Sequence, residues 1–222
     1  MDFRSALAQF NVDSDTLASA ASDFAKMIDE GETPSEYWEC MGTGSYKECY
    51  FIGDVAVKFA LECNETILRE KRVYDAALDE GLDAIFAHTI FLPLEQHLPA
   101  CFVGEEDDDE DDFDCVVFQE KIADILGNNE NIHAILWYDH QKSYNKYPLT
   151  GDEGENLTYT VVADLVQIFC YQEWIQAAID CYGLKFMLDL ATFCNKMRVD
   201  DLHAFNLGFR ADGSPVIFDF LS

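Results

Sequence analysis

Apolar residues recur at helical spacing in the first part of the chain. Residues 1–37 are predicted to be largely helical, with Ser14 as the N-cap of a helix that runs to about Ile28. The apolar positions of this helix lie three or four residues apart, at Leu17, Ala21, Phe24 and Met27. Gly31 and Pro34 then interrupt the pattern and end the segment. The pattern predicts an N-terminal helical extension.

Beyond the extension the apolar period changes to that of strands. Residues 46–50 and 55–60 are predicted strands, joined by a turn at 52–54. Helical spacing returns over 64–78, and Gly81 ends that helix. This part of the sequence therefore predicts two neighbouring strands followed by a helix.

Strand and helix patterns both occur in the rest of the chain. The predicted elements, in order, are short apolar runs at 85–94 and 101–103, a strand at 114–119, buried helices at 157–181 and 184–197, and a hairpin at 207–220. Residues 128–156 are polar and aromatic, and their pattern favours neither type of element. The whole order predicts an α+β fold without an internal repeat.

Charge limits the range of partners. The 222 residues include 43 Asp and Glu but only 14 Lys and Arg, which gives a net charge of −29. Direct binding to nucleic acid is not expected, because phosphate contacts need basic residues. A basic protein partner, mimicry of nucleic-acid charge, and simple solubility all fit this composition. The acidic stretch within 104–114 is predicted to be an exposed loop, because so many like charges cannot be buried together.

The sequence contains no feature that predicts export or membrane insertion. No apolar run reaches the roughly 18 to 20 residues of a membrane span, and the N-terminus does not resemble a signal peptide. The eight cysteines form no C-x-x-C motif or zinc-ligand spacing. They are expected to be buried, reduced thiols in a cytoplasmic protein that does not bind membranes.

The C-terminal hairpin brings together residues that can bind a metal. A turn centred on Asp212-Gly213 would pair Leu207 with Phe218, Phe209 with Val216, and Asn206 with Asp219. The amide oxygen of Asn206 and the carboxylate of Asp219 are hard ligands of the kind that Mg²⁺ prefers. Asp201, on the preceding loop, could accept a proton from an attacking hydroxyl. Each residue alone also fits an ordinary structural role, and only their joint spacing favours a site.

A glycine-containing segment precedes the first predicted strand. In Gly42-Thr43-Gly44-Ser45 the two glycines would allow backbone N–H groups to approach a phosphate closely. An ordinary tight turn would use the same residues.

A lysine follows on the second predicted strand. The strand period puts Ala56 and Lys58 on one face, with Val55 and Val57 on the other. Glu65 or Glu70 in the next helix could pair with Lys58 and direct its ammonium group toward a phosphate, although a lysine here also fits a solvated strand end.

The order of these motifs resembles that of the protein-kinase-like superfamily. Asp201-Leu202-His203-Ala204-Phe205-Asn206 is similar to the D-L-x-x-x-N of the kinase catalytic loop. Asp219-Phe220-Leu221, 13 residues after Asn206, is similar to D-F-G with its glycine replaced. The resemblance covers about residues 40–222 and is closest to the early serine/threonine kinases of T-odd bacteriophages.

The resemblance implies a minimal two-lobed kinase fold. The N-lobe would span 38–120, and a reduced C-lobe would span 121–222 and end just after the D-F-G-like motif. An activation segment and the helices that bind peptide substrates are not expected. The implied activity is that of an ATP- and Mg²⁺-dependent serine/threonine kinase, a phage effector acting on host proteins in the host cytoplasm.

The resemblance also assigns roles to individual residues. The implied nucleotide-binding residues are Gly42, Gly44, Ser45, Ala56, Lys58 and, in a hinge at 118–121, Gln119, Glu120 and Lys121. Lys58 would hold the α- and β-phosphates, and Glu70, or alternatively Glu65, would orient Lys58. Asp201 would position the substrate hydroxyl, while Asn206 and Asp219 would hold Mg²⁺.

Several positions depart from the kinase pattern. Val199-Asp200 replaces the usual His-Arg, Lys47 replaces the third glycine of the loop, and Leu221 ends the D-F-G-like motif. Two other functions therefore remain open. One is a pseudokinase-like acidic protein that inhibits a basic host partner, and the other is a small-molecule kinase resembling the aminoglycoside phosphotransferases.

Overall fold

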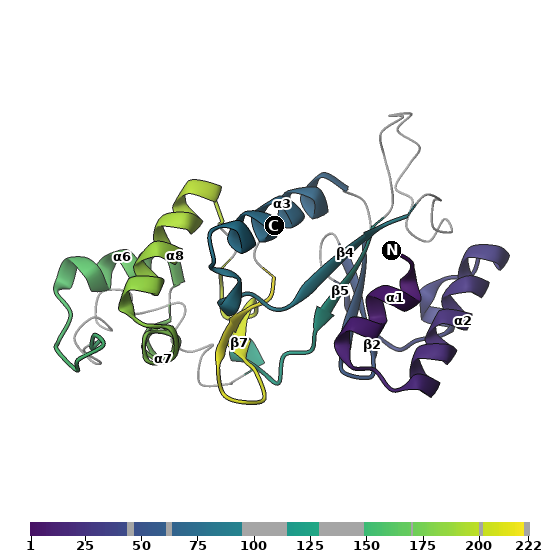
Figure 1. Ribbon diagram of the computed structural model, residues 1–222, viewed down its shortest axis with the longest axis horizontal. Coiled ribbons are helices and arrows are strands. Elements are labelled where there is room, and N and C mark those ends of the chain that lie inside the picture. Colours follow the sequence, from purple (N-terminus) through teal and green to yellow (C-terminus); the bar gives the residue numbers. More distant parts are fainter. Residues whose placement is uncertain are drawn as a thin grey trace. The chain divides into compact units, whose positions relative to one another are not determined.

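The computed structural model of the chain, shown in Figure 1, describes residues 1–43, 47–60, 64–94, 115–128, 149–169, 171–199 and 202–219. It confirms the predicted α+β class, and both of its sheets are antiparallel. Two compact units are present. Unit 1 comprises residues 1–72 and 88–121, and unit 2 comprises residues 73–87 and 122–222.

Unit 1 begins with helices, as the sequence predicts. They are α1 (Phe3–Leu7), η1 (Ala8–Phe10), α2 (Ser14–Glu30) and η2 (Pro34–Glu36). The N-cap of α2 is Asp13, so the assignment of Ser14 was wrong. One carboxylate oxygen of Asp13 accepts hydrogen bonds from the backbone N–H groups of Asp15 and Thr16, both at 3.0 Å. Adjacent Asp and Ser are both good capping residues, and the extended backbone of Asp13 decides between them.

A five-stranded antiparallel sheet forms the rest of unit 1, together with the first part of α3 (Asn64–Asp79). Its strand order is β1 (Cys40–Thr43), β2 (Lys47–Ile52), β3 (Val55–Ala60), β5 (Cys115–Glu120) and β4 (Thr89–Pro93). The predicted strands at 46–50, 55–60 and 114–119 and the helix at 64–78 are confirmed to within two residues. Strand β1 was missed, so Gly42 lies in a strand and not before the first one.

One face of this sheet packs against the N-terminal helices. Val55, Val57 and Phe59 of β3 belong to a buried core that also contains Phe3 and Leu7 of α1. The other members of this core are Ala6, Ala20, Tyr50, Ile52, Leu92, Val116 and Phe118. The ring of Phe3 stacks on Phe24 of α2 with centroids 4.1 Å apart. Residues 1–37 are therefore built into unit 1, as Figure 1 shows.

Unit 2 combines helices with a small antiparallel sheet. Its elements are the last part of α3, η3 (Asp83–Ile85), β6 (Asp124–Ile125), η5 (Leu126–Asn128), α6 (Tyr159–Phe169), α7 (Gln172–Tyr182), α8 (Leu184–Met197), β7 (Leu207–Phe209) and β8 (Pro215–Ile217). The strand order is β6-β7-β8. Helices α6, α7 and α8 pack against one another.

The predicted helix over 157–181 is in fact two helices, because α6 ends at Phe169 and Tyr171 adopts an extended backbone. The cause is a change in the phase of the apolar residues. The buried residues of α6 are Val162, Leu165, Val166 and Phe169, and those of α7 include Trp174, Ile175, Ala178 and Ile179. At about 100° per residue these two sets lie on nearly opposite sides of a continuous helix. A break lets both sets face the core.

The hairpin of β7 and β8 forms with a register one residue away from the predicted one. Leu207 pairs with Ile217, and Phe209 pairs with Pro215. The prediction assumed a two-residue turn, whereas the loop is the three residues 211–213. It is closed by Arg210, whose N–H donates to the Ser214 carbonyl at 2.9 Å. Gly213 takes the left-handed conformation with φ 85° that a three-residue hairpin loop requires.

Arg210 and Tyr182 fix the hairpin to the rest of unit 2. The guanidinium of Arg210 donates to the carbonyl of Phe86 at 2.8 Å and to that of Ala84 at 3.2 Å. The Tyr182 hydroxyl donates to the Pro215 carbonyl at 2.8 Å. Burial raises the pKa of Tyr182, so the phenol keeps its proton and remains a donor. These bonds tie both strands of the hairpin to η3 and α7.

The cysteines only partly match the expectation of buried, reduced thiols. Cys40, Cys49, Cys115, Cys181 and Cys194 form no disulfide, and Cys40 and Cys181 are exposed. The remaining three lie outside the described residues. Within the described part of the chain, no helix is both long and apolar enough to cross a membrane.

Replacing Gly213 by Ala is expected to destabilise unit 2 by about 1 kcal/mol, because an L-residue is strained at positive φ. No atom lies within 4 Å of the position that a Cβ would take, so the cost is conformational and not steric. Gly213→Asn is the matched control and should cost less, since Asn tolerates this conformation. Urea denaturation followed by circular dichroism measures both, and equal stability of wild type and Gly213→Ala would contradict the loop assignment.

Cys194 is expected to resist alkylation in the folded protein. Burial raises the pKa of its thiol to about 12, so the reactive thiolate is absent at pH 8. Cys40 and Cys181, which are exposed, should react first with iodoacetamide. Peptide mass spectrometry over a time course checks this order, with urea-unfolded protein as the control in which Cys194 reacts normally. Early modification of native Cys194 would disprove the prediction.

Candidate functional site

Strand register gathers polar residues on the face of the unit 1 sheet that does not pack against α1 and α2. Lys47 pairs with Ala60, so its side chain shares a face with Lys58 two residues earlier on β3. Gln119 pairs with both Ala56 and Thr89, which places all three on that same face. We call the set Lys47, Ala56, Lys58, Thr89 and Gln119 the polar face of unit 1. The predicted separation of Lys58 from Val55 and Val57 is thus confirmed.

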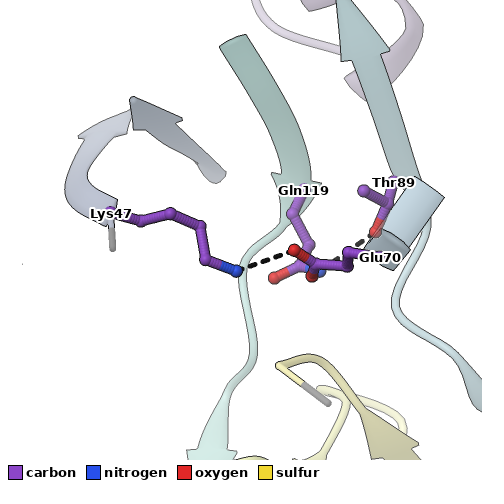
Figure 2. Close-up of polar contacts among 4 residues, drawn as sticks. All are labelled: Lys47, Glu70, Thr89 and Gln119. Atoms are coloured by element: carbon purple, nitrogen blue, oxygen red, sulfur yellow. Dashed lines mark hydrogen bonds and ion pairs between the residues drawn. The ribbon is translucent and has the colours of Figure 1, made fainter. Parts of the chain in front are cut away.

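Helix α3 supplies an acid to the polar face. Ile67 of α3 packs with Cys115 and Val117 of β5 on this side of the sheet. One turn further along α3, Glu70 is 1 % exposed, and its Oε2 accepts a hydrogen bond from Nζ of Lys47 at 2.7 Å. Figure 2 shows this contact. Because both side chains are almost fully buried, water screens their attraction only weakly.

Lys47 and not Lys58 is the cation that the structure places on Glu70. The role of Glu70 in orienting Lys58 therefore stays a prediction. Lys58 is itself buried, at 6 % exposure, on the same face. The second oxygen of Glu70, Oε1, is buried and has no hydrogen-bond partner in the described structure. A buried carboxylate oxygen without a donor is rare, and it leaves capacity for one more cation or hydrogen-bond donor.

The predicted hinge residues divide between the polar face and the strand end. The amide of Gln119 donates to the Thr89 hydroxyl at 3.0 Å, as Figure 2 shows, and Gln119 is 2 % exposed. The carboxylate of Glu120 accepts from the backbone N–H of His88 at 2.9 Å. The backbone N–H of Lys121 donates to the Asp54 carbonyl at 3.1 Å. All three residues are thus held firmly within unit 1.

In unit 2, the hairpin carries the predicted metal ligands at its open end. The corrected register places Asn206 opposite Phe218, whose N–H donates to the Asn206 carbonyl at 3.1 Å. Asp219 follows one residue later and is half-buried, while Asn206 is 6 % exposed. The side-chain amide nitrogen of Asn206 forms a hydrogen bond with Nε2 of His203 at 3.4 Å. Asp219 is therefore the residue after the one opposite Asn206, and not the facing partner that the sequence predicted.

Several predicted site residues lie outside the part of the chain that the structure describes. Gly44, Ser45 and Asp201 lie outside the described residues, as does the acidic stretch within 104–114. The same holds for the side chain of Glu65, the alternative partner of Lys58. Within the described ranges, no group of three or more His, Cys, Asp or Glu side chains is arranged to hold a metal. A metal at Asn206 and Asp219 would need further ligands, such as phosphate oxygens and water.

Sequence reasoning missed the part that Lys47 plays, although a usable signal was present. The turn at 52–54 allows a two-residue loop, which pairs Ile52 with Val55. Counting back along both strands from that pair puts Lys47 beside Ala60, on the Lys58 face. The residue was interpreted only as a departure from the glycine pattern.

Replacing Lys47 by Met is expected to destabilise unit 1 by about 3 to 5 kcal/mol, because Glu70 then stays buried without its cation. Replacing both, in Lys47→Met/Glu70→Leu, should recover most of the loss, since neither charge remains. Lys185→Met is the matched control, because Lys185 pairs with Asp189 on the exposed surface of unit 2 and should change little. Chemical denaturation measures all three. A Lys47→Met variant as stable as wild type would contradict the importance of this pair.

Comparison with known proteins does not assign the chain to a family. No protein-family model matches the sequence, and no curated protein sequence matches it. The functional interpretation therefore depends on the polar face of unit 1, on the hairpin of unit 2, and on the order of the motifs along the chain.

Proposed function

We propose that the protein is an ATP- and Mg²⁺-dependent phosphotransferase, a serine/threonine kinase that acts as a phage effector on host proteins. One observation supports this most directly. Among the described residues, the buried charged side chains are Lys47, Lys58 and Glu70, and all three belong to the polar face or to the helix beside it. In a chain with 43 acids and 14 bases, two of the described cations are thus buried on one face of a sheet.

A phosphate group is the ligand class that this charge balance favours. Burying a cation is costly unless an anion compensates it, so a sheet face with two buried ammonium groups favours an anionic ligand. In the proposed site Lys58 binds the α- and β-phosphates of ATP. Ala56, two residues earlier on the same face, offers a small apolar side chain for the adenine ring. Gly42 and the segment that follows it cover the phosphates with backbone N–H groups.

The unit 2 hairpin fits a magnesium ion. Asn206 and Asp219 have an amide oxygen and a carboxylate, which are hard ligands. The backbone N–H of Phe218, the residue before Asp219, donates to the Asn206 carbonyl and so joins the two chain segments. Mg²⁺ at these residues would neutralise phosphate charge as it develops during transfer. Asp201, five residues before Asn206, is proposed to orient the hydroxyl that attacks the γ-phosphate.

The net charge favours a second candidate function. Residues 95–114 contain ten acidic residues and neither Lys nor Arg. A protein that inhibits a basic host partner by its charge needs no phosphoryl transfer, even if it keeps a kinase-like nucleotide site. Activity with ATP separates the two candidates, because the acidic binder would act on its partner without making a phosphoprotein.

Asp219→Ala and Asp201→Asn are each expected to reduce phosphoryl transfer by at least about 100-fold. The first removes a metal ligand, and the second removes the carboxylate that orients the hydroxyl. Transfer of ³²P from labelled ATP to host-lysate proteins measures the effect. Calorimetry should show weakened Mg²⁺–ATP binding for Asp219→Ala and unchanged binding for Asp201→Asn.

The exposed residue Asp164 on α6 provides a control for both changes. Asp164→Ala and Asp164→Asn should retain full transfer and full Mg²⁺–ATP binding. Transfer that survives both Asp219→Ala and Asp201→Asn would refute the assignment of these residues. A wild-type protein that makes no phosphoprotein, yet still binds a basic host protein, would favour the second candidate function.

A further inference from the structure

We propose that Lys47 is a second phosphate-binding lysine, and that Glu70 is the shared carboxylate that positions Lys47 and Lys58 toward one polyphosphate. This inference rests on the proposed nucleotide-binding function. It adds a ligand residue that the kinase resemblance does not supply, because the resemblance places a glycine at position 47. It also defines the ligand as a chain of phosphates, whose charge is large enough to require two ammonium groups.

Strand pairing brings the two lysines to the same place. Cys49 of β2 pairs with Lys58 of β3, and Lys47 lies two residues before Cys49. Side chains two residues apart on a strand share a face, so Lys47 and Lys58 are diagonal neighbours on adjacent strands. Diagonal neighbours on a sheet lie about 7 to 8 Å apart, so the two flexible side chains can reach the same ligand.

The state of Glu70 points to a shared role. Its Oε2 binds Lys47 at 2.7 Å, while its Oε1 is buried without a hydrogen-bond partner in the described structure. A carboxylate can accept several hydrogen bonds, so Oε1 can receive the ammonium of Lys58 without displacing Lys47. Glu70 would then hold both lysines at one site.

Lys47 can bind Glu70 and a phosphate at the same time. An ammonium group has three donors, so one bond to a carboxylate does not exhaust its hydrogen-bonding capacity. Lys47 is also the first residue of β2, directly after the glycine-containing segment 42–45 and Tyr46. A lysine at this position supplies charge where a third glycine would supply only backbone N–H groups.

The test measures binding of four probes by calorimetry: Mg²⁺–ATP, Mg²⁺–ADP, adenosine and inorganic tripolyphosphate. Because Lys47→Gln alone strands the Glu70 charge, the comparison is made between Glu70→Gln and Lys47→Gln/Glu70→Gln. The two proteins differ only at Lys47, and neither contains the Glu70 carboxylate. Melting temperatures confirm that both are folded. Lys47→Arg in the wild-type background tests rescue by another cation, and Lys185→Gln is the matched surface control.

Removing Lys47 from the Glu70→Gln background should weaken Mg²⁺–ATP and tripolyphosphate binding by about 10- to 100-fold, the range for one hydrogen bond to a charged group. Adenosine binding should stay within about twofold, because adenosine has no phosphate. Lys47→Arg should bind Mg²⁺–ATP within several-fold of wild type, and Lys185→Gln should match wild type for every probe.

Three results would overturn the inference. Equal loss of adenosine and Mg²⁺–ATP binding would show that Lys47 acts only through the fold of unit 1. Unchanged binding of all four probes, with wild type binding Mg²⁺–ATP, would remove Lys47 from the site and leave the proposed function intact. A wild-type protein that binds neither Mg²⁺–ATP nor tripolyphosphate would overturn the proposed function together with the inference.

Discussion

The burial of β3 on both faces is the constraint on which unit 1 depends. Strand β3 pairs with β2 on one edge and β5 on the other, and its two faces must be covered separately. On one face, Val55 and Val57 pack into a large apolar core. The other holds Lys58, which tolerates burial only where charge is compensated. The site therefore follows from the same alternation that builds the core.

Local sequence predicted the elements that depend on local forces. The periods of β2, β3 and α3 are visible in the sequence because each element must bury a particular face. The hairpin register was not predictable in the same way. Gly213 suits both two-residue and three-residue loops, and the choice fits the bonds from Arg210 to the carbonyls of Ala84 and Phe86, which are distant in sequence. A one-residue difference in register put Phe218, and not Asp219, opposite Asn206.

In the candidate site, too, only the features that depend on local sequence were predictable. The placement of Lys58 on the face opposite Val57 follows from strand alternation alone. The pairing of Glu70 with Lys47 requires the register of two strands and the position of a helix, so it depends on contacts 23 residues apart. A resemblance in motif order supplied Lys58 as the expected partner, because it compares positions along the chain and not side chains in space.

The two described tryptophans give each unit its own optical probe. Trp38 lies in unit 1, partly buried, with its ring 6.0 Å from Phe3 and 6.1 Å from Phe59. Trp174 lies fully buried in unit 2, and its indole N–H donates to the Gly208 carbonyl at 3.0 Å. Emission from a buried indole shifts to longer wavelength when water reaches it. With the third tryptophan of the sequence, Trp137, replaced by Phe, removing either Trp38 or Trp174 leaves a fluorescence signal that reports on the unfolding of one unit.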